Sequence, residues 1–180
     1  MADGYYAMPA AAEPLLAEKA SSLKPVAYGT RKTIALIGVL FGVCAAVVFG
    51  GAQKEFLNPW AAALGAASGV VALVTYFEHK RRAAAERDGV VVASHTTLLR
   101  LFAILGGCVG VAGFLGFLAS GVYEKEKVTG RSSYVAAVWG FLLAKWGVLL
   151  LLYTNGYAKR DEAMADAMPA PAAPSQNQYE

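Results

Sequence analysis

Four long blocks of apolar residues, nearly free of charge, alternate with short polar stretches along the chain. The blocks cover residues 33–51, 60–77, 98–122 and 134–153. A helix rises 1.5 Å per residue, so about 20 residues cross the roughly 30 Å of hydrocarbon in a bilayer. The blocks have neither the polar face of a soluble helix nor the alternation of a membrane-spanning strand. The pattern therefore predicts an all-α fold, an integral membrane bundle of four transmembrane helices arranged as two hairpins.

The two ends of the chain are polar and have the composition of disordered tails. Residues 1–32 contain three prolines, which interrupt any long helix. Residues 158–180 are acidic at first and then rich in alanine and proline. We therefore expect a membrane domain over residues 33–157, with a disordered tail on each side.

Composition and charge support a membrane protein and set its orientation. Of the 180 residues, 57% are hydrophobic and only 16% charged, against about 25% charged in an ordinary soluble domain. Eleven lysines and arginines lie in the two tails and the middle connection, against four in the other two loops. This asymmetry predicts that both termini are cytoplasmic. The net charge of +3 is spread over tails and loops, which argues against nucleic acid as a partner.

Four basic residues beside the apolar blocks are expected to set this topology and to attract anionic lipid headgroups. They are Lys80, Arg81, Arg82 and Arg100. The two histidines, His79 and His95, flank the middle connection and are interpreted as solvated loop residues rather than pH sensors.

Small residues recur at helical spacing in the blocks and are candidates for helix packing. Pairs of glycines four residues apart share one helix face and let two backbones approach closely within lipid. We expect such ridges either to pack the bundle itself or to form an interface with another subunit. The candidate glycines are Gly38, Gly42, Gly65, Gly69, Gly106, Gly110, Gly113 and Gly140.

Lys145 is the one charged residue deep inside a block. A charge near the middle of the bilayer costs a few kcal/mol or more, and such residues commonly face a pathway or a buried partner. No Asp or Glu lies within the four blocks, so the membrane-embedded part of the chain offers no ion-pair partner. Three interpretations stay open: snorkelling toward the headgroups, contact with a partner subunit, and a role in transport.

Other sites are weakly indicated. Tyr5 and Met8 fit the short Tyr-x-x-apolar pattern of a sorting signal. No catalytic constellation, phosphate loop or set of metal ligands is evident, so the sequence predicts neither an enzyme nor a cofactor. In topology alone the layout resembles small tetraspan proteins such as claudins, but the claudin Trp-Leu-Trp signature is absent, so the resemblance implies no function.

These features predict a non-catalytic membrane protein. The first hypothesis is a small structural subunit or organiser of a membrane complex that acts through glycine-ridge packing. Its partners would be the lipid bilayer and either further copies of itself or other membrane subunits. The alternative is a small oligomeric transporter or channel in which Lys145 lines an anion path.

Overall fold

The structure, a computed structural model, confirms the predicted fold class. It describes residues 27–52, 56–87 and 95–165, which contain helices and no strand. Four helices are long and apolar enough to cross a membrane. They are α2 (Tyr28–Val47), α3 (Pro59–Arg87), α4 (Thr96–Tyr123) and α5 (Ser133–Ala165), and a π-helical turn, η2 (Val48–Ala52), follows α2.

Three of the helices extend well beyond the apolar blocks that predict them. Helix α2 begins five residues before its block, α3 continues for ten residues after residue 77, and α5 for twelve after residue 153. Residues 28–32 and 158–165, which the sequence assigned to disordered tails, are therefore helical. The extensions of α3 and α5 are stabilised because their polar side chains pair with each other across the two helices.

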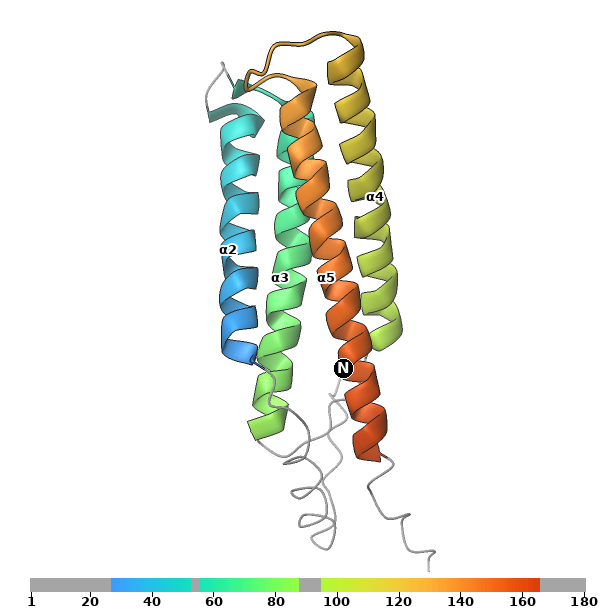
Figure 1. Ribbon diagram of the computed structural model, residues 1–180. Helices are drawn as coiled ribbons and strands as arrows, with labels where there is room; N and C mark the ends of the chain where they lie inside the picture. Colours follow the sequence, from blue (N-terminus) through green and yellow to red (C-terminus); the bar gives the residue numbers. More distant parts are fainter. Residues whose placement is uncertain (1–26, 53–55, 88–94, 166–180) are drawn as a thin grey trace, which may run out of the picture.

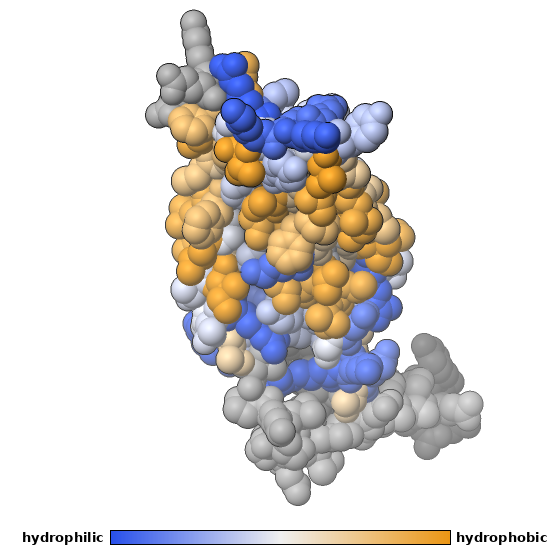
Figure 2. Space-filling view, turned by 45° about the horizontal axis from the view of Figure 1, so that its top comes forward, coloured by the Kyte–Doolittle hydropathy of each residue, from blue (hydrophilic) through white to orange (hydrophobic). Residues whose placement is uncertain are grey.

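The helices stand side by side in the order α2, α3, α5, α4 (Figure 1). Helices α3 and α5 are central, and α2 and α4 contact them from opposite sides without contacting each other. An apolar band covers the middle of the visible face, with hydrophilic residues above and below it (Figure 2). Such a band between two polar ends is what a protein surrounded by lipid needs.

Within the first hairpin, two glycine faces bring α2 and α3 into backbone contact. A methyl group on Gly42 would lie 2.5 Å from the Cα atom of Gly69. One added to Gly65 would overlap the methyl group of Ala45. Close backbone approach at glycines provides the van der Waals contact that joins helices in lipid.

The second hairpin packs in the same way, but the close contact is made by Gly107 rather than by the expected Gly106. A methyl group on Gly147 would lie 2.5 Å from the backbone nitrogen of Gly107, and one on Gly110 would overlap the backbone of Ala144. Gly140 lies equally close to the backbone of α4. At Gly106 and Gly113, by contrast, the nearest atoms are side-chain atoms of Val71 and Leu64 at the ordinary contact distance of 3.4 Å.

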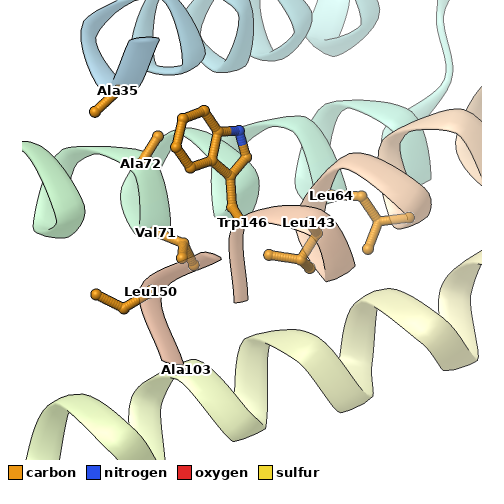
Figure 3. Close-up of a cluster of buried hydrophobic side chains, with 8 residues drawn as sticks. All are labelled: Ala35, Leu64, Val71, Ala72, Ala103, Leu143, Trp146 and Leu150. Carbon is orange, nitrogen blue, oxygen red and sulfur yellow. The ribbon is translucent and has the colours of Figure 1, made fainter. Parts of the chain in front are cut away.

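The two hairpins meet through the side chain of Trp146, which crosses from α5 to α2 (Figure 3). Its indole ring lies beside Ala35 and Ala72 and occupies the space that the missing side chain of Gly38 leaves. Leu143 and Leu150 continue this core along α5, and each is at most 1% exposed. The core therefore consists of large side chains from α5 packed against alanines of α2, α3 and α4 and against Leu64 and Val71 of α3.

Candidate functional site

The buried face of α3 changes from apolar to polar near the C-terminal end of the helix. Ala72, Thr75, His79 and Arg82 follow one another at helical spacing, and each is at most 6% exposed. On α5 the facing positions are Tyr153, Tyr157 and Asp161, four residues apart. We call the set His79, Arg82, Glu78, Tyr153, Tyr157 and Asp161, with Tyr28 and Arg31 of α2, the histidine cluster.

His79 is the centre of this cluster and is 1% exposed. Its Nδ1 atom lies 2.6 Å from the hydroxyl oxygen of Tyr157, in the hydrogen-bonded range. The Tyr153 ring lies edge-on to the imidazole, with 4.7 Å between ring centroids. The buried Nε2 atom has no hydrogen-bond partner among the described residues. A buried nitrogen without a partner is uncommon in proteins and often marks a functional position.

Ion pairs fix the surroundings of His79. The Nε–H group of Arg82 donates to Glu78 at 2.6 Å, and the Nη1 group donates to both carboxylate oxygens of Asp161 at 3.0 and 3.1 Å. The guanidinium carbon also lies 4.3 Å from the centre of the Tyr157 ring. Arg82 thus joins α3 to α5 and holds the tyrosine that bonds His79. Arg160 and Glu86 form a second ion pair between these helices, at 2.7 Å.

Helix α2 reaches the cluster through ring contacts and through side-chain hydrogen bonds of Tyr28 with Glu86 and of Arg31 with Tyr157. The ring of Tyr28 stacks on that of Tyr157 with centroids 6.2 Å apart. The guanidinium carbon of Arg31 lies 4.8 Å from the centre of the Tyr153 ring. Such contacts are worth about 0.5–2 kcal/mol each. The ends of α3 and α5, by contrast, are joined to each other by ion pairs.

The interpretation of His79 as a solvated loop residue is wrong. His79 lies inside α3 because that helix continues ten residues beyond the apolar block. Arg82, expected at the headgroups, is also buried, because Glu78 and Asp161 take its hydrogen bonds. His95, by contrast, is exposed and directly precedes α4.

A sequence signal for this buried site exists. Ser68, Ala72, Thr75 and His79 share one helix face, and Tyr153, Tyr157 and Asp161 share another. The basic residues after residue 77 obscure this signal, because such a run usually marks the end of a membrane span.

The remaining predicted site residues are spread over the bundle. Lys80 is exposed, Arg81 pairs with Glu78 at 3.3 Å, and Arg100 donates a hydrogen bond to Asn155 at 2.8 Å. The possible sorting signal, Tyr5 and Met8, lies outside the described residues.

Lys145 lies near the middle of the apolar part of α5 and points away from the bundle. It is exposed, whereas the neighbouring Trp146 is 5% exposed, and its Nζ atom lies 5.9 Å from the centre of the Trp146 ring. The glycine ridges and Lys145 therefore face different ways: the closest glycine contacts are inside the bundle, and Lys145 is on the surface.

A comparison with known families matches the second hairpin to a transporter family. Residues 98–146, which include α4 and the first part of α5, match the model of a family described as endosomal and lysosomal haem transporters encoded by haem-responsive genes. No solved structure matches the chain. The chain is a multi-pass membrane protein. The matched segment contains Lys145, whereas His79 and Tyr157 lie outside it.

The histidine cluster contains side-chain types that proteins use to bind an iron porphyrin. A histidine nitrogen is the usual axial ligand of haem iron, and a hydrogen bond on the other ring nitrogen orients such a ligand. Tyrosine rings pack against flat apolar molecules, and arginine binds carboxylates. Among the described residues, no three His, Cys, Asp or Glu side chains could together hold a bare metal ion. One imidazole is enough for a porphyrin, because the porphyrin nitrogens supply the other ligands.

Proposed function

We propose that this protein is a membrane transporter whose cargo is haem, and that the Nε2 atom of His79 binds the haem iron during transport. The observation that carries the proposal is the buried Nε2 atom, which has no partner among the described residues, on an imidazole that Tyr157 already orients. The partial match to haem transporters supports the cargo. Of the two hypotheses from the sequence, the transporter agrees better with this match than the structural organiser does.

The proposed site needs an opening motion, because His79 is 1% exposed. The element best placed to move is the first turn of α2, whose described contacts with the cluster are made by Tyr28 and Arg31, whereas ion pairs join α3 to α5. When this turn moves away, the ion-paired ends of α3 and α5 keep His79 and Tyr157 in place. A site that is closed at rest and opens at one helix end suits a transporter, which must bind its cargo and release it again.

Absorbance titration of the purified protein with haem tests this proposal. Wild-type protein should give the spectrum of a histidine-ligated haem. His79→Ala should lose that spectrum and bind haem at least about tenfold more weakly, because the iron ligand is gone. Tyr157→Phe keeps the ring but removes the hydrogen bond, and should weaken binding by about tenfold.

The matched control is His95→Ala, which removes the only other histidine of the chain. It should leave both the spectrum and the affinity unchanged. The proposed site is refuted if His79→Ala binds haem with the wild-type spectrum and affinity, or if His95→Ala alone abolishes the spectrum.

A further inference from the structure

The interior of the bundle is closed to a cargo along the middle of the described helices. At Gly42 and Gly69, and again at Gly147 and Gly107, the backbones of paired helices are in direct contact. Between the hairpins, the indole of Trp146 fills the remaining space and is 5% exposed. No flat molecule the size of a porphyrin fits between helices packed to this density.

The described interior also has few free hydrogen-bonding groups. The hydroxyl groups of Thr75 and Thr154 donate to backbone carbonyls one turn earlier on their own helices, at 2.8 and 2.7 Å. They therefore offer no free hydrogen-bonding groups to an anion. A path through membrane protein for an anion needs polar groups at successive depths. In the described core between the histidine cluster and the opposite end of the bundle, such groups are few, chiefly the hydroxyls of Ser68, Thr75 and Thr154. A cargo that crosses beside this bundle therefore travels along its outer surface.

The charge on that surface at mid-depth is Lys145. It lies twelve residues from Ser133 and eight from Tyr153, or about 18 Å and 12 Å along the helix axis. The residues next to it on the same face of α5 are Phe141 and Val148, which are 53% and 52% exposed. Lys145 is thus a cation on an apolar, partly aromatic strip that faces lipid.

Several partners for this cation are disfavoured by charge and distance. The four apolar blocks contain no Asp or Glu, and a second copy docked through the same face would bring another Lys145 toward the first. Lipid headgroups lie about 15 Å from the middle of a bilayer, well away from a side chain that is already near mid-depth. A mobile anion that itself crosses the apolar layer fits this position better.

We propose that Lys145 is a second cargo-binding site, on the lipid-facing side of α5, for the carboxylates of a flat amphiphilic anion. The inference rests on the proposed transport function, since haem carries two propionate carboxylates on an apolar ring. The ammonium group of Lys145 donates charge-assisted hydrogen bonds to a carboxylate while the ring lies on the strip formed by Phe141 and Val148. The cargo then crosses along the outside of the bundle with its charges neutralised at mid-depth.

The test uses protoporphyrin IX without iron, so that ligation by His79 is not involved. Wild-type protein in liposomes should accelerate the transfer of this fluorescent porphyrin to a quencher trapped inside. Lys145→Met should reduce the protein-dependent rate at least about tenfold, and Lys145→Arg should retain most of it. The dimethyl ester, which lacks the carboxylate charges, should cross equally fast with wild-type protein and with Lys145→Met.

Lys127→Met is the control, because it removes an exposed lysine from the loop between α4 and α5. It should transfer porphyrin at the wild-type rate. Equal rates for Lys145→Met and wild type would overturn the inference and leave the proposed function intact. Loss of transfer together with dissociation of an oligomer in native mass spectrometry would also overturn it, since Lys145 would then be a subunit contact. If wild-type protein accelerates neither haem nor porphyrin, the proposed function itself fails.

Discussion

Replacing Gly110 by leucine should prevent the second hairpin from packing and abolish most of the folded protein. Even a methyl group on Gly110 would overlap the backbone of Ala144, which cannot rotate away as a side chain can. Helices α4 and α5 would have to separate along their middle. Overpacking a core commonly costs 1–3 kcal/mol, and we expect at least about 3 kcal/mol here because backbone meets backbone. Thermal unfolding in mild detergent measures the loss.

Gly116→Leu is the matched control for this change. It makes the same substitution on the same helix, but no atom lies within 4 Å of the added carbon in the described structure. Because leucine favours helix more than glycine does, this variant should be as stable as wild type or slightly more so. Equal stability of Gly110→Leu and Gly116→Leu would show that α4 and α5 do not pack as described.

Replacing Arg82 by alanine should destabilise the ends of α3 and α5 and disorder the histidine cluster. The change leaves Glu78, which is 8% exposed, with Arg81 as its remaining ion-pair partner, and removes the contact with Asp161. Removing one member of a buried ion pair typically costs 3–5 kcal/mol. We expect about 3 kcal/mol, since Arg81 still compensates Glu78 in part. Proteolysis at the ends of the two helices and thermal unfolding both report this change.

Lys80 provides the control, because it is exposed and lies two residues before Arg82 on the same helix. Lys80→Ala should change stability by less than about 0.5 kcal/mol. In the double variant Glu78→Gln, Arg82→Met, the buried carboxylate is gone as well, so part of the lost stability should return. A double variant that is less stable than Arg82→Ala would contradict this account of the ion pairs.

The sequence predicts the four helices because their apolar blocks are longer than those of soluble proteins. It does not predict where α3 and α5 end, since the residues after position 77 look like the aqueous boundary of a span. Their helical continuation depends on ion pairs between residues far apart in the chain, such as Arg82 with Asp161. Such pairings cannot be read from local composition.

The sequence also does not show which face of each helix points into the bundle. The blocks are apolar all round, so nothing in them shows that Gly107 rather than Gly106 contacts α5, or that Lys145 faces outward. The burial of His79 is hidden for a related reason: its hydrogen-bond partner Tyr157 lies 78 residues away, and its Nε2 atom has no partner among the described residues. Only the packed bundle brings these atoms together.

The central claim, that the protein carries haem across a membrane, is tested most directly by uptake into liposomes. Haem is added outside liposomes that contain an encapsulated haem-binding reporter, with wild-type protein, His79→Ala or no protein in the membrane. We predict that liposomes with wild-type protein take up haem well above the rate of protein-free liposomes. His79→Ala should reduce this protein-dependent uptake at least about tenfold. Uptake by wild-type liposomes no faster than by protein-free liposomes would contradict the account.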